Sequence, residues 1–247
     1  MTNPETAGIE RPATLAIDIG GTGLKASILD SAGRMATDRV RAMTPPRLTP
    51  RLLVSTLGTL VEPLPPYDRV SVGFPGVVRN GTVRTAPNLG SRAFQGFDLA
   101  AALEQRLGKP VRVVNDADMQ GWGAVRGAGV EMVITLGTGF GSSLFIDGRL
   151  GPHLELAHHP FRKGRTYEEE LGERARKKLG RGKWNRRVHE AIDQLRGLTT
   201  FDHLYIGGGN ARKLEPGLPD DVSVVDNAAG ILGGIRLWDA PLPGRGT

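Results

Sequence analysis

Three short glycine-rich turns, each directly after an apolar run, constrain the fold of this 247-residue chain most strongly. They read DIGGTG from Asp18, LGTGFG from Leu136 and IGGGN from Ile206. Because glycine has no Cβ, such turns let backbone N–H groups come close to phosphate oxygens. One such turn is more simply explained as a tight hairpin, whereas three in one chain favour a nucleotide or phosphate cradle. The pattern predicts an α/β protein.

The order strand, glycine turn, strand occurs twice, at residues 18–25 and again at residues 136–142. Two similar halves predict two α/β lobes with a cleft between them. We expect a flexible leader over residues 1–13, an N-terminal lobe over 14–118 and a C-terminal lobe over 119–247. The last helix, expected at 227–238, can return to pack on the first lobe.

The composition excludes several classes of protein. The chain has no cysteine, which rules out disulfides, a thiol nucleophile and thiolate metal sites. No apolar run approaches the roughly 20 residues that span a bilayer. The first residues, MTNPETAGIERPAT, lack the basic-then-apolar pattern of a secretory signal. We therefore expect a cytoplasmic protein without a membrane partner.

Five segments in order resemble the ROK sugar kinases, which belong to the actin/hexokinase-like (ribonuclease H-like) ATPase fold. They are DIGGTGLK, VVNDAD, LGTGFGSS, the E-x-x-H in HLELAHH, and YIGGGNA, and the likeness extends over residues 15–238. Within the family, VRTAPNLG, ELAHHPFRKGRTYEE and IGGGNARK are most similar to the polyphosphate glucokinases. The resemblance implies a kinase that phosphorylates the 6-hydroxyl of glucose or mannose. It also implies magnesium, ATP and/or inorganic polyphosphate as donor, and a homodimer.

The catalytic carboxylate is expected at the end of the KPVRVV strand. Phosphoryl transfer to a hydroxyl needs a base beside that hydroxyl, and Asn115-Asp116 supplies an amide and a carboxylate there. By resemblance, Asp116 is the general base and Asn115 binds neighbouring hydroxyls of the sugar. Asn and Asp are also good helix N-caps, and DADMQGWGAV, residues 116–125, can be the helix that they cap. From the residues alone the two interpretations are equal; the resemblance favours the base.

The same resemblance implies further sugar-binding residues, namely Asn88, Glu155, His158 and Glu168. Glu168 competes with a structural interpretation, because Thr166 and Glu169 have the spacing of a capping box. Many ROK proteins hold zinc in a cysteine-rich motif that this chain lacks, so we expect no zinc. The family's E-x-G-H has alanine at position 157 here, which puts the local backbone in question.

The glycine turns are expected to bind phosphate or nucleotide. Asp18 is expected to hold magnesium through water. The remaining phosphate-binding candidates are Gly20, Gly21, Thr22, Gly23, Lys25, Gly137, Thr138, Gly139, Gly207, Gly208, Gly209 and Asn210.

One segment carries the basic charge of the chain. Residues 162–187 contain 11 Lys and Arg against 4 Asp and Glu, a balance of +7, so the rest of the chain sums to −1. The i,i+4 pairs Glu170–Arg174 and Glu173–Lys177 explain two of these cations. The other cations of the segment include Arg162, Lys163, Arg165, Arg181, Lys183, Arg186 and Arg187. A polyanion could bind there, and we expect a polyphosphate patch at Lys183, Arg186 and Arg187.

A second class of function is a sugar-responsive regulator, since ROK repressors share this fold. Such repressors carry a helix-turn-helix ahead of it, and the 14 residues before Leu15 are too few for that domain. The basic segment also lacks the interleaved aromatics of a single-strand binding platform. We therefore expect an enzyme and no nucleic-acid partner.

Overall fold

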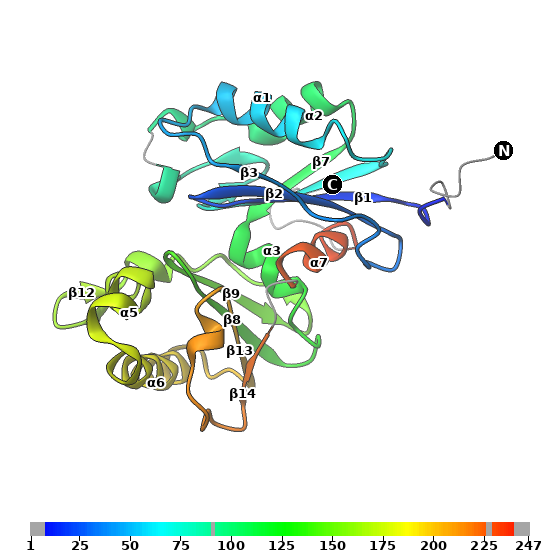
Figure 1. The fold of residues 1–247 in the computed structure, drawn as a ribbon. Coiled ribbons are helices and arrows are strands. Elements are labelled where there is room, and N and C mark those ends of the chain that lie inside the picture. Colours follow the sequence, from blue (N-terminus) through cyan, green and yellow to red (C-terminus); the bar gives the residue numbers. More distant parts are fainter. Residues whose placement is uncertain (1–7, 90–91, 226–228, 240–247) are drawn as a thin grey trace. The chain divides into compact units, whose positions relative to one another are not determined.

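The computed structural model describes residues 8–89, 92–225 and 229–239 (Figure 1). The chain forms two compact units. Unit 1 comprises residues 1–119 and 230–247, and unit 2 comprises residues 120–229. The division therefore falls after Met119, inside a helix, and the chain returns to unit 1 at its end.

Unit 1 is built on a five-stranded mixed sheet in the order β3-β2-β1-β4-β7. β1, β2 and β3 are antiparallel, while β4 and β7 run parallel to β1. The strands are β1 (Thr14–Ile19), β2 (Gly23–Leu29), β3 (Val40–Met43), β4 (Arg69–Phe74) and β7 (Val111–Asn115), with a small hairpin of β5 (Val78–Arg79) and β6 (Thr82–Val83).

Helices α1 (Pro50–Val61) and α2 (Leu99–Leu107) cover one face of this sheet (Figure 1). Both helices have side-chain N-caps: Thr49 and Asp98 accept hydrogen bonds from the first turns of α1 and α2. Gly108 ends α2 in the left-handed conformation (φ 65°), which favours glycine. The helices cover the alternate apolar residues of β1 and β2, including Leu15, Ile17 and Leu24.

Helix α7 (Ala229–Arg236) packs on the opposite face of the same sheet (Figure 1). Ser71 of β4 donates a hydrogen bond to the carbonyl of Gly234 at 2.6 Å and accepts one from the indole of Trp238 at 2.8 Å. The guanidinium of Arg112 lies 4.6 Å from the centre of the Trp238 ring, close enough for a cation–π contact. These contacts tie the end of the chain to unit 1.

The leader that the sequence predicted through residue 13 is anchored from Glu10 onward. The Glu10 carbonyl accepts a hydrogen bond from Ser31, and Asp68 accepts one from the Ala13 amide at 2.7 Å. The guanidinium of Arg11 also pairs with Asp68 and holds the pKa of that carboxyl below its ordinary value.

Unit 2 repeats the sheet of unit 1. Its strand order is β10-β9-β8-β13-β14, with β8, β9 and β10 antiparallel and β13 and β14 parallel to β8. The strands are β8 (Val130–Leu136), β9 (Phe140–Ile146), β10 (Arg149–Leu150), β13 (His203–Gly207) and β14 (Val222–Val224), with a small hairpin of β11 (Pro160–Arg162) and β12 (Arg165–Thr166). The repeat confirms the α/β class expected from the two similar halves of the sequence.

Three helices pack on the unit 2 sheet: α4 (Tyr167–Leu171), α5 (Glu173–Leu179) and α6 (Arg181–Thr199). Helix α6 buries residues three or four apart, which is the spacing of one helical face. These residues are Trp184, Val188, Ala191, Ile192 and Leu195. The Trp184 indole donates to the Leu171 carbonyl at 2.8 Å, which joins α6 to α4.

A short helix, α3 (Asp116–Trp122), follows β7 directly, and the division between the units lies within it. Within the described residues, no helix combines the length and the apolar character that crossing a membrane requires.

Candidate functional site

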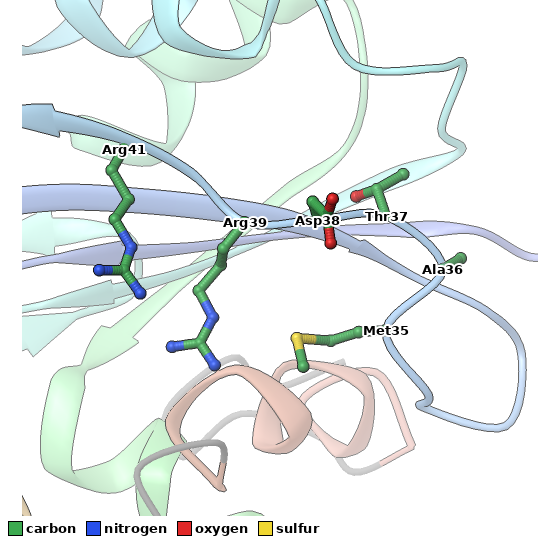
Figure 2. Close-up of a pocket in the computed structure, with 6 residues that line it drawn as sticks. All are labelled: Met35, Ala36, Thr37, Asp38, Arg39 and Arg41. Atoms are coloured by element: carbon green, nitrogen blue, oxygen red, sulfur yellow. The ribbon is translucent and has the colours of Figure 1, made fainter.

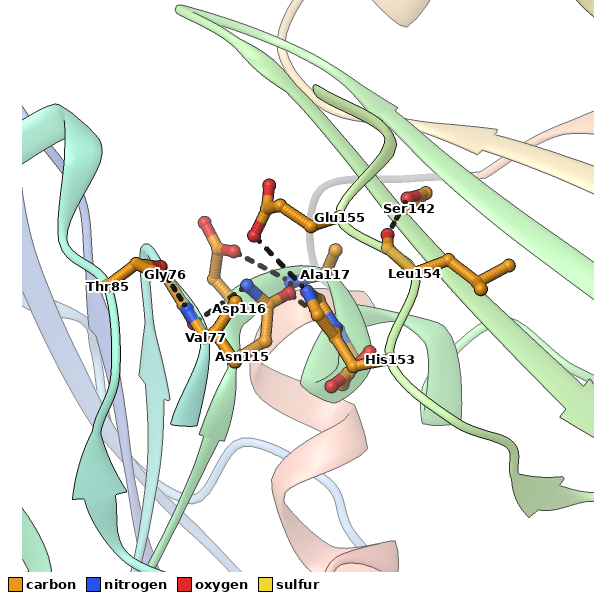
Figure 3. Close-up of polar contacts among 11 residues, drawn as sticks. Gly76, Val77, Thr85, Asn115, Asp116, Ala117, Ser142, His153, Leu154 and Glu155 are labelled. Carbon is orange, nitrogen blue, oxygen red and sulfur yellow. Dashed lines mark hydrogen bonds and ion pairs between the residues drawn. The ribbon is translucent and has the colours of Figure 1, made fainter. Parts of the chain in front are cut away.

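Asn115, the last residue of β7, caps α3. Its Oδ1 accepts hydrogen bonds from the amides of Ala117 at 2.8 Å and Asp118 at 3.3 Å (Figure 3). Its Nδ2 donates to the carbonyl of Gly76 at 3.1 Å. The structural role that competed with sugar binding is thus present. A hydroxyl-binding role for this buried side chain rests on the second hydrogen of its amide.

The Asp116 carboxyl has a strongly raised pKa. Burial is the largest cause, and the negative charge of Asp18 is the next; together they raise the pKa from 3.8 to about 7. A hydrogen bond from the Ala117 amide at 2.9 Å opposes this shift. A carboxylate with a pKa near neutrality can accept a proton from a hydroxyl far better than an ordinary aspartate.

Two glycines that the sequence reasoning did not single out make room for this arrangement. A Cβ on Gly76 would lie 2.1 Å from the Thr85 carbonyl oxygen. A Cβ on Gly73 would lie 2.8 Å from the Met119 side chain and 3.3 Å from the Asp116 Cα. Both belong to the GFPG stretch, whose Gly-Pro composition was the available signal.

The first glycine turn is a tight hairpin between β1 and β2. The Gly20 amide donates to the Gly23 carbonyl at 2.9 Å, and a Cβ on Gly20 would lie 2.9 Å from that same oxygen. Gly21 and Thr22 are exposed at its tip. The turn also has a brace that the sequence reasoning missed, since Thr44 donates through its hydroxyl to the Gly20 carbonyl at 2.7 Å.

Asp18 and Lys25 face each other below this turn, with Lys25 Nζ 2.9 Å from Asp18 Oδ2. Asp18 also lies near enough to Asp116 to raise the pKa of the Asp116 carboxyl. Two carboxylates that repel each other beside a glycine turn suit a divalent cation, and carboxylate oxygens are ligands that Mg²⁺ prefers. The residues present therefore fit magnesium.

The second and third glycine turns pack against each other within unit 2. The Asn210 side chain donates to the Gly137 carbonyl at 3.0 Å, and its amide donates to the Leu136 carbonyl at 2.8 Å. Gly208 has a φ of 88°, and a Cβ there would lie 2.4 Å from the Leu136 carbonyl oxygen. Thr138 and Gly209 remain exposed. The tertiary structure thus brings together two turns that are about 70 residues apart in the sequence.

Glu173, which the sequence reasoning left outside the site, supports this pair of turns. Its amide donates to the Gly137 carbonyl at 2.9 Å. Its carboxylate binds Arg176 and Lys177 and receives a hydrogen bond from Asn210, and these contacts lower its pKa to about 2.

Glu155 and His158 flank a short 3-10 turn (Leu156–His158) in unit 2. The Nε2 of His153 lies 3.4 Å from the Glu155 carboxylate and lowers its pKa, so Glu155 is ionised at neutral pH (Figure 3). His158 is exposed. Ala157 is buried in the turn and does not have a positive φ, so alanine fits where the family has glycine.

The remaining sugar-binding candidates differ in what the structure describes. Glu168 lies half-buried in the first turn of α4. The capping box expected beside it is confirmed, because Thr166 and Glu169 exchange both hydrogen bonds. Asn88 belongs to a 3-10 turn (Pro87–Leu89), and its side chain lies outside the described part of the chain. No group of three potential metal-ligating His, Asp or Glu residues occurs among the described residues.

The basic segment is more fully paired than its local spacing indicated. The buried carboxylate of Glu170 pairs with Arg187 of α6 and lies 3.7 Å from Arg165. Arg162 pairs with Glu190 at 2.9 Å. The expected pair of Glu170 with Arg174 is wrong, because Glu170 points into unit 2 rather than along the surface of the helix.

This pairing changes the expected polyphosphate patch. Arg187 is only 22% exposed and holds α6 to α4 through Glu170. Lys183 and Arg186 are exposed, and no ion pair is recorded for them within the described residues. The expected pair Glu173–Lys177 is confirmed at 3.1 Å.

Comparison with known proteins identifies the family of this chain. The family model of the ROK family matches residues 14–161. The polyphosphate glucokinase of Mycobacterium tuberculosis (strain CDC 1551 / Oshkosh) is 31% identical over 253 residues, which cover 94% of this chain and 95% of that protein. The chain belongs to the ROK family.

Solved structures of ROK proteins have the same fold. The inorganic polyphosphate/ATP-glucomannokinase from Arthrobacter sp. strain KM aligns with a TM-score of 0.83 and 30% identity, covering 92% of this chain and 98% of that one. The ROK family glucokinase from Streptomyces griseus, solved with glucose and AMPPNP, aligns with a TM-score of 0.72 and 21% identity, covering 91% and 98%. The actin/hexokinase-like ATPase fold expected from the sequence is confirmed.

Proposed function

We propose that this protein transfers a phosphoryl group from polyphosphate or ATP to the 6-hydroxyl of glucose, with Asp116 as the general base. The observation that carries the proposal is the Asp116 carboxyl, whose pKa is raised to about 7 at the end of β7, beside Asp18. The full-length similarity to a polyphosphate glucokinase, at 31% identity, supports the same reaction.

In this reaction Asp116 takes the proton of the sugar hydroxyl as the hydroxyl oxygen attacks the terminal phosphorus of the donor. The bond from that phosphorus to the bridging oxygen breaks, and the electron pair leaves with the shortened donor. The products are a sugar 6-phosphate and either ADP or a polyphosphate that is one unit shorter. The proton remains on Asp116 until solvent removes it. Positioned base catalysis of this kind contributes roughly 10²–10⁴-fold to the rate.

Magnesium would be held by the carboxylate of Asp18, through water, and it would neutralise charge on the donor's phosphates. Lys25 is bound to one oxygen of Asp18, which leaves the other oxygen for a hydrated cation. The exposed tips of the glycine turns supply backbone amides to the phosphates, at Gly21 and Thr22 in unit 1 and at Thr138 and Gly209 in unit 2, because the amides of Gly20, Gly137 and Asn210 are already bonded within the turns.

The sugar is bound by groups that can hold two neighbouring hydroxyls at once. Glu155 is ionised and so offers two acceptor oxygens, and His158 is exposed beside it. Asn115 contributes the second hydrogen of its amide. We assign Asn88 and Glu168 to the same site on the family resemblance alone.

Polyphosphate as a donor is supported by exposed cations of α6 that form no ion pair with any carboxylate in the described part of the chain. Lys183 and Arg186 on α6 form the proposed patch in unit 2, and Arg187 leaves it because of its pairing with Glu170. We also expect a homodimer, which sedimentation velocity on the purified protein will test.

The test is a matrix of donors and acceptors on the purified protein. We expect glucose phosphorylation from both ATP and long-chain polyphosphate, with mannose as the second acceptor. The Asp116→Asn variant should lose roughly 10²–10⁴-fold in kcat while its affinity for glucose changes little. A matched control is Asp98→Asn, which keeps the N-cap of α2 in the same unit. Near-normal turnover by Asp116→Asn would remove this residue from the mechanism.

A further inference from the structure

Strand β3 forms one edge of the unit 1 sheet, and two arginines extend from it on the side where α7 lies (Figure 2). Arg39 precedes the strand, and Arg41 is two residues further along. Residues two apart on a strand point to the same face, so the two guanidinium groups form a row (Figure 2). They line an open hollow of about 610 Å³ together with Met35, Ala36, Thr37 and Asp38.

The row starts at the first glycine turn. Arg41 is the register partner of Lys25 on β2, and Lys25 is in turn the partner of Asp18 on β1. Partners in an antiparallel pair lie about 5 Å apart and share a face of the sheet. Asp18, Lys25 and Arg41 thus follow one another across the sheet, and Arg39 extends the line by about 7 Å along the edge.

The hollow has a net positive charge, because two arginines line it against one aspartate. No ion pair or hydrogen bond of the Arg39 or Arg41 side chain is recorded within the described residues. Asp38 directly precedes Arg39, and it lines the same hollow with an exposed carboxylate. Arg41 is exposed and Arg39 is half-buried, so an anion can reach both.

We propose that Arg39 and Arg41 bind the distal phosphates of a long polyphosphate chain whose reacting end lies at the Gly20–Gly23 turn. This inference rests on the proposed function and names a donor-binding surface in unit 1 that is separate from the α6 patch of unit 2. A nucleoside triphosphate ends at the turn, whereas a polyphosphate continues past Lys25 onto the row. The hollow offers no aromatic side chain for base stacking, which favours polyphosphate over single-stranded nucleic acid.

The test compares the double variant Arg39→Gln/Arg41→Gln with the control Arg51→Gln/Lys109→Gln. The control removes the same charge from two exposed residues of unit 1, on α1 and directly after α2. With glucose as acceptor, we expect the row variant to raise the KM for long-chain polyphosphate about tenfold at low salt. Its KM for ATP and for tripolyphosphate should stay within about twofold of the wild-type values. Losing two phosphate contacts should also make the slope of log KM against log salt shallower by about 1.4 for the long chain.

Binding calorimetry with long-chain polyphosphate, without glucose, separates this inference from the proposed function. The inference is supported if the row variant binds polyphosphate about tenfold more weakly than both the wild type and the control. It is overturned if the row variant and the control bind alike, or if single-stranded DNA of equal phosphate number displaces polyphosphate from the row. A wild type that binds polyphosphate through the row but transfers no phosphate would instead refute the proposed donor.

Arginines on an edge strand also discourage edge-to-edge association of sheets. That role alone would increase aggregation of the row variant and leave its donor kinetics unchanged. Light scattering on the same samples distinguishes the two, and unchanged kinetics with increased scattering would overturn the inference.

Discussion

The ionised Asp116 carboxylate should lower the free energy of unfolding of the protein. The Asp116→Asn variant should therefore be more stable than the wild type at a pH where Asp116 is ionised. In the folded protein the pKa of this carboxyl is about 7, against 3.8 for the ordinary group. The difference, 7 − 3.8, is about three units, and at 1.36 kcal/mol per unit this is about 4 kcal/mol. Because the side chain is only half-buried, water screens part of this effect, and we expect about 2–4 kcal/mol.

The sign follows from proton linkage. Between pH 3.8 and about 7 the unfolded chain has released this proton while the folded protein still holds it. The unfolded state therefore binds fewer protons, and the contribution of Asp116 to the free energy of unfolding falls as the pH rises through this window. Above pH 7 the destabilisation is complete. Asparagine has no charge at any pH, so the free energy of unfolding of the variant does not fall through this window as that of the wild type does.

The assay is urea unfolding of the wild type and of Asp116→Asn at several pH values from 4 to 8. At pH 4 the two proteins should have similar free energies of unfolding, because both carry an uncharged side chain at this position. At pH 8 the variant should be more stable by about 2–4 kcal/mol. Asp98→Asn controls for the loss of a carboxylate at the start of another helix in the same unit. A difference that stays constant from pH 4 to pH 8 would refute the raised pKa.

Three further predictions concern the remaining groups of the site. The kcat/KM for glucose should rise with pH through an apparent pKa near 7, as Asp116 loses its proton. Asp18→Asn should move this rise to lower pH, because it removes a negative charge that raises the pKa of Asp116. A pH profile that does not move would contradict this. Glu155→Gln should raise the KM for glucose about 10- to 100-fold, the effect of losing a charged hydrogen bond, and leave the KM for ATP within about twofold; calorimetry that finds unchanged glucose binding would reject this role. Gly208→Ala should weaken ATP use and lower the free energy of unfolding by about 1–3 kcal/mol, because its Cβ meets the Leu136 carbonyl at a φ of 88°. A Cβ on Gly209 has open space, so Gly209→Ala should keep the free energy of unfolding of the wild type; an equal loss of stability in both variants would contradict this reasoning.

Local patterns in the sequence predicted the elements of this fold well. Helix α1 begins after Thr49 and α2 begins after Asp98, and each of these residues is of a type that commonly caps helices. The capping box at Thr166 and Glu169 also formed as its spacing predicted. These features depend on backbone conformation and on contacts within one helical turn, which neighbouring residues alone determine.

The sequence did not predict which polar groups pair across the fold. Spacing along the helix assigned Glu170 to Arg174, but the carboxylate is buried against Arg187, 17 residues away in the sequence. From the sequence, Asn115 was equally suited to sugar binding or to capping. In the structure its side-chain oxygen accepts a hydrogen bond from the Ala117 amide, and its side-chain nitrogen donates one to the Gly76 carbonyl. Such pairings depend on how helices pack on a sheet, and no local periodicity reports that.

The chemical properties of the site also come from tertiary structure. From its sequence, Asp116 is a carboxylate after a strand, with nothing to distinguish its acidity from that of any other aspartate. Parallel pairing of β1, β4 and β7 brings Asp18 near it, and the surrounding chain removes water, so its pKa rises to about 7. The sequence alone determined where the glycine turns and the carboxylates stand along the chain. Only the folded sheet decided which charges would lie close enough to change one another's ionisation, because electrostatic and desolvation effects depend on distance in space.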